Sequence, residues 1–395
     1  MTRDLNNLIQ QEAELLFEKV MAYREHLHMY PELSFQEHRT MEFVSKTLHE
    51  IGIHHESGIG GTGVVALISP NNRATSSPCI GLRADLDALP IEEENEVTYR
   101  SKHEGVMHAC GHDVHTAILL GVAEILQKHN SLLKQPVKLI FQPGEEKNPG
   151  GASILINAGV LENPVVERMY GLHVYPEFQA GHVGFKPGLY MASCDEIYLT
   201  IIGKGGHGAM PENCIDPIAI GSTLITQLQQ VVSRRANPTT PSVLSFGHFE
   251  AIGSTNIIPE RAHIKGTFRT HNEQWRNEAL HLIETQTNAI ISSFGAQYEL
   301  NISRGYPCLI NDESTTENLK NKAIKVLGKA HVHDLTLRMT SEDFAFYSQE
   351  IPVCFFRLGV SGNHEQFGVH HPKFNIDSKA LITGMQILCA ACFDI

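Results

Sequence analysis

The sequence predicts an α/β protein in which a mostly parallel sheet lies between helices and the chain is interrupted by a smaller α+β domain. In the first half of the chain, and again after about residue 304, apolar strand patterns alternate with helical ones. That alternation is typical of a parallel sheet with helices on both faces. Between these two parts the expected elements run βαββαβ, which is the ferredoxin-like order.

Helices in the alternating part are expected where apolar residues recur every three to four positions, and strands where short apolar runs occur. One helix is expected behind a capping box of Ser34 and Glu37. The other expected helices cover 5–28, 113–128, 150–158, 314–327, 342–349 and 377–392. The expected strands cover 62–69, 79–84, 137–142, 168–174 and 352–358.

The central part predicts strands at 196–202, 243–249, 262–270 and 297–303, with helices at 216–234 and 273–293. We therefore assign residues 1–187 and 305–395 to one discontinuous domain and residues 188–304 to an inserted domain. A chain of 395 residues is too long for one ordinary hydrophobic core, which agrees with two domains. Gly188 and Gly305 lie close to the expected hinges.

The charge balance argues against several classes of partner. The 44 acidic residues outnumber the 31 basic ones, so the formal net charge is -13. Such a chain repels nucleic acid and anionic membranes, and no cluster of Lys and Arg opposes this. No stretch approaches the roughly 20 apolar residues of a membrane span. We therefore expect no nucleic-acid partner, no membrane partner and a cytoplasmic location.

The cysteines do not suggest a disulfide framework, because the eight of them are scattered along a long chain. Cys389 and Cys392 form a C-x-x-C, but they lie in the apolar run ALITGMQILCAACF. A buried helix explains that run better than a metal or redox motif.

Side chains of the types that bind metals follow the expected strands, where α/β enzymes place their sites. Alone, each would be a helix cap, a hydrogen-bonded core histidine or a solvated carboxylate. Together they would cost too much to bury unless a cation or a proton neutralised them. They are Asp85 and Asp87 after 79–84; His108, Cys110, His112, Asp113 and His115 before the next helix; Glu145 and Glu146 after 137–142; His173 at the end of 168–174; and His370 and His371 in a late loop.

The donor types restrict the metal. Cys110 and His112 are separated only by Gly111, which lets the backbone approach closely. Thiolate and imidazole prefer Zn, Mn, Fe, Co or Ni over Mg or Ca. The Glu146 carboxylate suits a second ion, and Glu145 beside it is placed to act as a general base.

These stretches resemble the aminoacylase/carboxypeptidase-type metallopeptidase family, and most closely its branch of hippurate hydrolases, auxin-conjugate hydrolases and N-acetyldiaminopimelate deacetylases. The resemblance runs in family order from about residue 24 to 375. The matching stretches are YREHLHMYPELSFQE, GLRADLDALPI, MHACGHDVHTA, FQPGEE with the following GGA, GLHV, GKGGHGAMP, STNIIPERAHIKGTFRT, SEDFAFY and HHPKF.

The resemblance implies two divalent ions per subunit, Zn or Mn in the first place and Ni, Co or Fe as alternatives. Glu145 would be the general base. Asp87 would orient a ligand histidine, a role for which Asp85 competes. The implied metal ligands are Cys110, His112, Glu146, His173 and His370.

The inserted domain is implied to act as a lid and to form a homodimer. His207 would stabilise the oxyanion and contact the substrate. Asn256 and Arg269 would bind polar groups of the substrate, although an ion pair within the sheet explains Arg269 equally well. Two positions depart from the family pattern: Glu212 where many relatives have His, and His371 where they have Asn, Ser or Thr.

The expected function is that of a metal-dependent amidohydrolase of the aminoacylase/carboxypeptidase type. It would cleave the amide bond of small-molecule N-acyl amino acids, either hippurate-like, acetylated or related conjugates, by a metal-activated water with Glu145 as the base. A hydrolase with Cys110 as nucleophile is a second hypothesis, and it leaves the glutamates and His173 without a purpose. A non-catalytic binding protein is a third, and it would have lost a ligand or the base.

Overall fold

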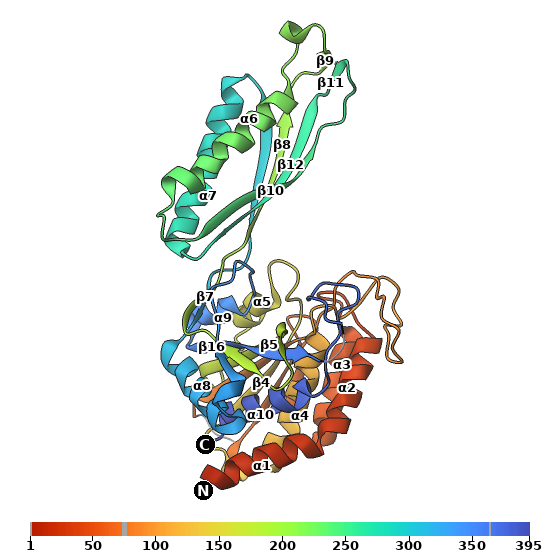
Figure 1. Ribbon diagram of the computed structural model, residues 1–395, viewed down its shortest axis with the longest axis vertical. Helices are drawn as coiled ribbons and strands as arrows, with labels where there is room; N and C mark the ends of the chain where they lie inside the picture. Colours follow the sequence, from red (N-terminus) through yellow and green to blue (C-terminus); the bar gives the residue numbers. More distant parts are fainter. Residues whose placement is uncertain (1, 73–76, 363–364) are drawn as a thin grey trace. The chain divides into compact units, whose positions relative to one another are not determined.

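The computed structural model describes residues 2–72, 77–362 and 365–395 of the chain. The chain forms two compact units (Figure 1). Unit 1 consists of Met1–Tyr190, Ile310–Leu337 and Asp343–Ile395, and unit 2 of Met191–Leu309 and Arg338–Glu342. The segment Arg338–Glu342 groups with unit 2 because the Ala192 N–H donates to the carbonyls of Arg338 and Thr340, at 3.1 and 3.2 Å.

Within the described residues, unit 1 contains an eight-stranded sheet in the order β1-β2-β4-β3-β5-β16-β6-β15. The neighbours β4, β3, β5 and β16 are parallel, whereas β1, β2 and β6 join antiparallel. The mostly parallel sheet is thus confirmed. The strands are β1 (His55–Ile59), β2 (Gly63–Ile68), β3 (Cys79–Asp85), β4 (Val137–Gln142), β5 (Val166–Gln179), β6 (Val183–Phe185), β15 (Val332–Asp334) and β16 (Val353–Ser361).

The helices of unit 1 cover this sheet (Figure 1). Helix α4 packs against α2, α10 and β3, and α10 also packs against α8 and β16. Every residue of β3 and β4 is buried, which explains their unbroken apolar runs. The helices are α1 (Thr2–Leu15), α2 (Phe17–Met29), α3 (His38–Ile51), α4 (His112–Lys128), α5 (Gly151–Asn157), α8 (Glu313–Leu327), α9 (Ala345–Glu350) and α10 (Ala380–Cys392).

Unit 2 has the predicted ferredoxin-like arrangement. Its four-stranded sheet has the order β10-β12-β8-β13 with all neighbours antiparallel, and side chains from α6 and α7 pack with those of β8 in one core. Alternate residues of β8 are buried, as expected for a sheet with helices on one face. The elements are β8 (Asp195–Ile202), α6 (Pro217–Gln230), a π-helical turn (Val231–Arg235), β10 (Ser242–Glu250), β12 (Arg261–Thr270), α7 (Glu273–Ser293) and β13 (Gln297–Arg304).

Four short strands form two further two-stranded sheets, and the sequence predicted none of them. They contain two to four residues each, too few for a periodic pattern. They are β9 (Gly206–His207) with β11 (Ile257–Ile258), and β7 (Gly188–Met191) with β14 (Leu309–Asn311). No helix within the described ranges combines the length and apolar character that crossing a membrane requires.

The predicted capping box of Ser34 and Glu37 is wrong. The side chain of Glu37, the residue before α3, makes no capping bond to the helix. Its carboxylate is buried and accepts hydrogen bonds from Thr62 Oγ1 and the Gly144 N–H, at 2.5 and 2.8 Å. Ser34 Oγ donates to Asp87 instead, at 2.6 Å. Both side chains therefore tie the chain before α3 to the loops at the carboxyl ends of the strands.

Two helix boundaries also differ. The expected helix 5–28 is two helices, α1 and α2, that meet at Leu16. The expected helix 342–349 begins only at Ala345, two residues after Asp343, whose side chain accepts from Gln142 Nε2. The expected buried helix around Cys389 and Cys392 is confirmed, since both thiols are buried in α10.

Candidate metal centre

The candidate site lies at the carboxyl edge of the unit 1 sheet. Strands β4, β3 and β5 are adjacent and parallel, so the residues that follow them meet at one edge. Asp85 ends β3, and His173 lies within β5. Cys110 comes from the loop before α4, His112 is the first residue of α4, Glu146 comes from the loop after β4, and His370 lies in the loop before α10.

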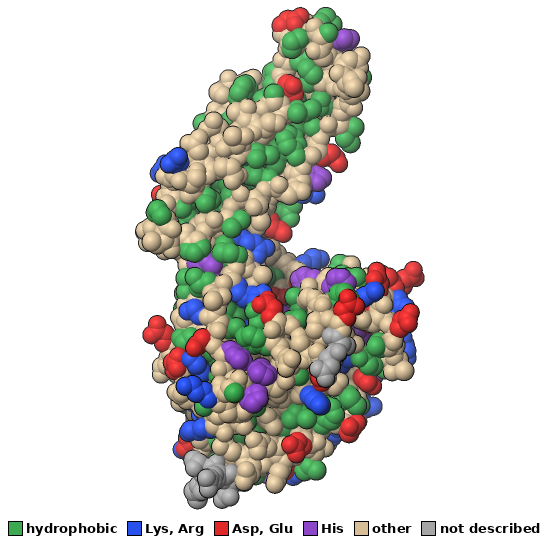
Figure 2. All heavy atoms as spheres, in the orientation of Figure 1, with side chains coloured by type: hydrophobic (Ala, Val, Ile, Leu, Met, Phe, Trp, Pro, Cys, Tyr) green, Lys and Arg blue, Asp and Glu red, His purple; other side chains and the backbone are tan. Residues whose placement is uncertain are grey.

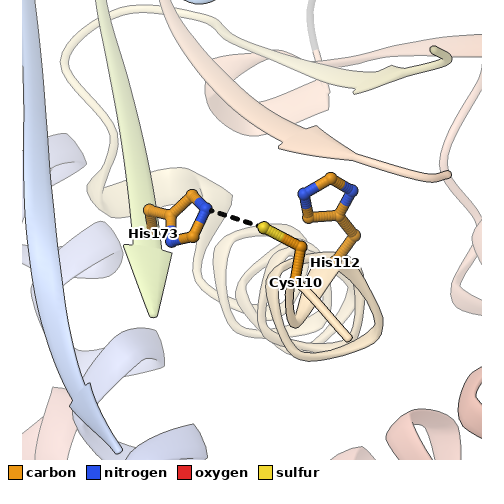
Figure 3. Close-up of side chains that lie close together, drawn as sticks. All are labelled: Cys110, His112 and His173. Atoms are coloured by element: carbon orange, nitrogen blue, oxygen red, sulfur yellow. Dashed lines mark hydrogen bonds between the residues drawn. The ribbon is translucent and has the colours of Figure 1, made fainter. Parts of the chain in front are cut away.

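Cys110 is at the centre of the cluster. Its Sγ lies 3.3 Å from His173 Nε2 and 3.3 Å from His370 Nε2. The same His370 nitrogen lies 3.1 Å from Glu146 Oε1. Figure 3 shows the sulfur directed at the His173 ring from β5, with the His112 ring beside it at the start of α4.

Backbone geometry brings these side chains together. Gly111 has φ 82, and a Cβ there would lie 2.7 Å from Val174 Cγ2, so only glycine lets the loop approach β5 so closely. His370 has φ 66, a conformation that is rare for residues other than glycine. Its N–H donates to the Ala109 carbonyl at 2.8 Å, which ties the late loop to the Cys110 loop.

In their neutral forms, His173 and His112 would present a lone pair rather than a hydrogen to the centre. His173 donates its Nδ1–H to the Val174 carbonyl at 2.8 Å, which leaves Nε2 as the acceptor beside Cys110. His112 donates its Nδ1–H to Asp87 Oδ1 at 3.1 Å. In both rings, the nitrogen that does not face the centre thus donates a hydrogen bond, as it usually does in metal-binding histidines.

Asp87 fits the orienting role better than Asp85. Its second oxygen accepts from Ser34 Oγ at 2.6 Å and from the Glu146 N–H at 2.9 Å. Asp87 therefore links His112 to the loop that carries Glu145 and Glu146, here called the glutamate loop. Asp85 accepts instead from His115 Nδ1 at 2.6 Å and lies 3.6 Å from His112 Nε2.

The charges of the cluster are unbalanced. Burial alone would lower the pKa of His112, but Asp85 and Asp87 raise it to about 10. Burial, together with Glu146 and Glu145, raises the pKa of the Cys110 thiol well above its usual range. Without a cation the centre therefore favours extra protons. A bound cation would replace them, because it stabilises thiolate and neutral imidazole.

The residues present fit a pair of divalent cations. Among the described residues, His112 Nε2 and Glu146 Oε1 are buried without a hydrogen-bond partner. Such buried orphan atoms are rare unless an ion or a water satisfies them. Among the predicted ligands and Glu145, donor atoms lie within 4.8 Å of one another in three overlapping groups: Cys110, His112 and His173; Cys110, Glu146 and His370; and His112, Glu145 and Glu146.

A buried ion-pair network supports the glutamate loop, and the sequence did not reveal it. Arg83 donates to Asp85 at 2.6 Å and to Asp343 at 2.7 Å, with all three side chains fully buried. Asp343 also accepts from Gln142 Nε2, and its N–H lies 3.5 Å from Glu145 Oε1. A charged Arg83 inside an apolar strand was the available signal, since such a residue needs an acidic partner.

The candidate residues of unit 2 fall into two places. His207 in β9 pairs with Ile257, and the Gly208 N–H donates to the Asn256 carbonyl at 2.8 Å, so His207 and Asn256 lie together. Arg269 lies near the end of β12, where its Nη1 donates to the Met339 carbonyl at 3.0 Å. Among the described residues it forms no ion pair, so the ion-pair explanation of Arg269 is not supported.

The fold and the cluster together define the class: an α/β protein with a group of side chains suited to binding metals at the carboxyl edge of its sheet. Comparison with known proteins then identifies it further. The chain belongs to peptidase family M20/M25/M40, whose sequence model matches residues 81–394. It is a hydrolase of the amidohydrolase type that acts on amide bonds, as its relatives do.

Three relatives illustrate the relationship. The chain is 40% identical over 373 residues to N-acetyl-L-cysteine deacetylase of Bacillus subtilis (strain 168), covering 94% of this chain and 87% of that one. It is 42% identical over 292 residues to N-acyl-L-amino acid amidohydrolase of Geobacillus stearothermophilus, covering 74% and 78%. The structure of the Bacillus subtilis YXEP protein, a dinuclear metal binding peptidase from the M20 family, matches with a TM-score of 0.78 at 33% identity, covering 96% and 98%.

Proposed function

We propose that this protein hydrolyses the amide bond of small N-acyl amino acids, with hippurate-like, acetylated and related conjugates as the substrate class. One observation carries the proposal: Cys110, His112, Glu146, His173 and His370 converge beside the further carboxylate of Glu145. The activities for which two relatives are named, N-acetyl-L-cysteine deacetylase and N-acyl-L-amino acid amidohydrolase, support this substrate class.

In this proposal the five converging residues hold two divalent ions, Zn or Mn in the first place and Ni, Co or Fe as alternatives. When bound, the ions would polarise the amide carbonyl and lower the pKa of a water. The description of the YXEP protein as dinuclear metal binding supports a pair of ions. Asp87 holds the ring of His112 by its Nδ1–H, and this fixes which nitrogen faces the centre.

Glu145 is the proposed general base. The residue is only 6% exposed, and its carboxylate belongs to the donor group formed with His112 and Glu146. A carboxylate there would accept a proton from the attacking water and return it to the nitrogen of the departing amine. The nearby Asp343 N–H, 3.5 Å from Oε1, restricts its orientation.

His207, Asn256 and Arg269 are the proposed substrate contacts of unit 2. The Ala209 N–H donates to His207 Nδ1 at 3.1 Å, so a neutral His207 carries its hydrogen on Nε2. That N–H is suited to donate to an amide oxygen as negative charge develops on it. Arg269 retains donor groups beyond the one bonded to Met339 and would suit a substrate carboxylate.

Hydrolysis of a panel of N-acyl amino acids tests the proposal. With acetyl-, benzoyl- and indoleacetyl-amino acids and acetyl-diaminopimelate, we expect turnover of at least one class, measured as released free amine. Removal of metal by a chelator should abolish turnover, and re-addition of Zn or Mn should restore it. Alkylation-sensitive turnover that survives chelation would instead support Cys110 as a nucleophile. No turnover of any substrate by the metal-loaded protein would refute the proposal.

We also propose that residues 188–304 form the dimerisation domain. Strand β10 is an edge of the unit 2 sheet, and an unpaired edge is a ready site for pairing. Large apolar side chains of this unit are exposed, among them Phe249 at 39%, Ile252 at 81% and Ile257 at 55%. Light scattering should give twice the chain mass of 43.8 kDa. A stable mass of one chain at working concentration would contradict the proposal.

A further inference from the structure

A buried histidine of α4, His115, lies beside the candidate metal centre but is not one of its predicted ligands. Figure 2 shows histidine side chains at the surface of unit 1, whereas His115 is only 1% exposed. Its ring centroid lies 5.4 Å from that of His112 and 4.9 Å from that of His173. His115 is therefore next to the rings of two proposed ligands, and the proposed function gives it no role.

Both ring nitrogens of His115 already have partners. Nε2 accepts a hydrogen bond from the Val174 N–H at 3.0 Å, so the hydrogen of the ring must lie on Nδ1. Nδ1 donates that hydrogen to Asp85 Oδ1 at 2.6 Å. Donor atoms of Asp85, His112 and His115 also lie within 4.8 Å of one another. His115 could bind an ion, however, only by releasing Val174 or Asp85, so its hydrogen bonds fit a role other than that of a ligand.

The position of Val174 in the sheet explains why it bonds to a side chain. Strand β3 pairs with β5 only as far as Arg83, which lies opposite Gly171. Val174 is three residues further along β5, beyond the ladder between these two strands, and is only 1% exposed. A buried N–H at such a place needs another acceptor, because leaving it unpaired costs about 1–3 kcal/mol. The imidazole of His115 supplies that acceptor.

The same residue of β5 also holds the ring of His173. The Val174 carbonyl accepts the Nδ1–H of His173 at 2.8 Å, and this leaves His173 Nε2 beside Cys110 Sγ at 3.3 Å. Imidazoles thus bind Val174 at both its N–H and its carbonyl. A continuous series of hydrogen bonds runs from Asp85 through His115 and Val174 to His173.

A buried charge fixes the first member of this series. Arg83 donates to Asp85 Oδ2 at 2.6 Å, and both side chains are buried. Asp85 Oδ1 remains for His115. Because the guanidinium orients the carboxylate, and the carboxylate orients the imidazole, the ring of His115 has little freedom to turn away from Val174.

We propose that His115, held by Asp85, is a positioning residue that sets the ring of His173 and thereby the metal affinity of the centre. This inference rests on the proposed function, in which His173 is a metal ligand. Asp87 orients His112 through a direct hydrogen bond. Asp85 acts on His173 indirectly, through His115 and the backbone of Val174. Each of the two ligand histidines is thus oriented by its own carboxylate.

Binding of Co²⁺ tests the proposal, because the absorption spectrum of this ion reports the geometry of its ligands. His115→Phe keeps a ring of similar size but removes both nitrogens. We expect it to weaken the binding of at least one Co²⁺ by about 10–100-fold, the usual cost of removing a partner that orients a ligand. Competition with a chelator measures the affinity, and the spectrum of the Co²⁺-loaded variant should differ from that of the wild type.

Two further variants separate the hydrogen bonds of His115. In His115→Gln the amide oxygen can reach the position of Nε2 and accept from the Val174 N–H. In His115→Asn the shorter amide reaches only the position of Nδ1, where it can donate to Asp85. His115→Gln should therefore retain more Co²⁺ affinity than His115→Asn. The reverse order would overturn the proposal, because the connection to His173 runs through Val174.

Thr116→Val is the matched control. Thr116 is buried, follows His115 in α4 and donates to the backbone carbonyl of Asp85 at 2.7 Å. The substitution removes a buried hydrogen bond but leaves the series from Asp85 to His173 intact. It should lower the melting temperature while keeping the Co²⁺ affinity and spectrum of the wild type. Equal Co²⁺ affinities in His115→Phe and Thr116→Val would overturn the proposal.

A failure of this inference is distinguishable from a failure of the proposed function. Wild-type protein that binds no Co²⁺ would overturn the proposed metal centre and, with it, the role of His115. Wild-type protein that binds Co²⁺ with the same affinity and spectrum as His115→Phe would overturn the role of His115 alone. Neither measurement depends on the choice of an amide substrate.

Discussion

Glu145→Gln should reduce kcat for the best N-acyl amino acid by about 10²–10⁴-fold, the usual contribution of a general acid or base. The amide occupies the same space as the carboxylate but cannot accept the proton of the attacking water. Because Cys110, His112, His173, Glu146 and His370 remain in place, the metal content of the variant should equal that of the wild type. Steady-state kinetics and elemental analysis on the same samples measure both quantities.

The neighbouring glutamate is the matched control. Glu146 lies 3.1 Å from His370 and has a buried oxygen without a hydrogen-bond partner, so it fits a metal ligand rather than the base. Glu146→Gln should therefore lose bound metal together with activity, and excess metal should restore part of that activity. If Glu145→Gln keeps wild-type kcat, or if the two variants lose metal equally, the assignment of roles is wrong.

Arg24→Met should lower the free energy of unfolding of unit 1 by about 3–5 kcal/mol, the usual cost of breaking a buried ion pair. Arg24 Nε donates to Asp113 at 2.8 Å, and their side chains are only 2% and 1% exposed. The same guanidinium packs over the Tyr99 ring at 4.6 Å and donates to Asn375 at 3.1 Å. Removing it would leave the Asp113 carboxylate buried with only His28 as a charged partner.

Lys19→Met is the matched control, because it removes a cation from the same helix. The Lys19–Glu124 pair is 2.7 Å long but lies at the surface, so its loss should cost no more than about 1 kcal/mol. Urea unfolding of the metal-saturated proteins measures both changes. Equal destabilisation by the two substitutions would contradict the prediction. The double variant Arg24→Met/Asp113→Asn should recover part of the loss, since it no longer buries an unpaired charge.

The ion pair of Arg24 with Asp113 also holds in place the part of α4 that contributes to the candidate metal centre. Asp113 immediately follows His112 in the first turn of α4, and α2 carries both Arg24 and His28. His28 donates to Asp113 and to Glu93 through its two ring nitrogens, at 2.8 and 3.1 Å. The start of α4, and with it the loop that carries Cys110 and His112, is thus anchored by buried charges rather than by apolar packing alone.

The buried environment of Cys110 separates the metal hypothesis from the thiol hypothesis. A nucleophilic cysteine needs a low pKa and access to solvent. Cys110 is buried, and burial together with Glu146 and Glu145 raises the pKa of its thiol well above the usual range. A cation would favour the thiolate at this position, whereas a free thiol there is a poor nucleophile. The cluster therefore favours Cys110 as a ligand.

By itself, the sequence determined the repeating elements and the types of donor at the sheet edge. Strand β4 at 137–142 and helix α7 at 273–293 have the predicted bounds. In both, the spacing of apolar residues along the sequence reflects which side chains are buried. The donors could be grouped because residues that follow parallel strands meet at one edge. Burying so many ionisable groups together is costly, and this pointed to cations.

Only the tertiary structure decided which of these side chains pair. Arg83 meets Asp343 across 260 positions of sequence, and Arg24 meets Asp113 across 89, and no local pattern encodes either contact. The same limit explains why Ser34 and Glu37 suggested a capping box although their side chains bond elsewhere. A side chain takes the partner that leaves the fewest buried polar atoms unsatisfied, and that choice depends on every segment packed around it.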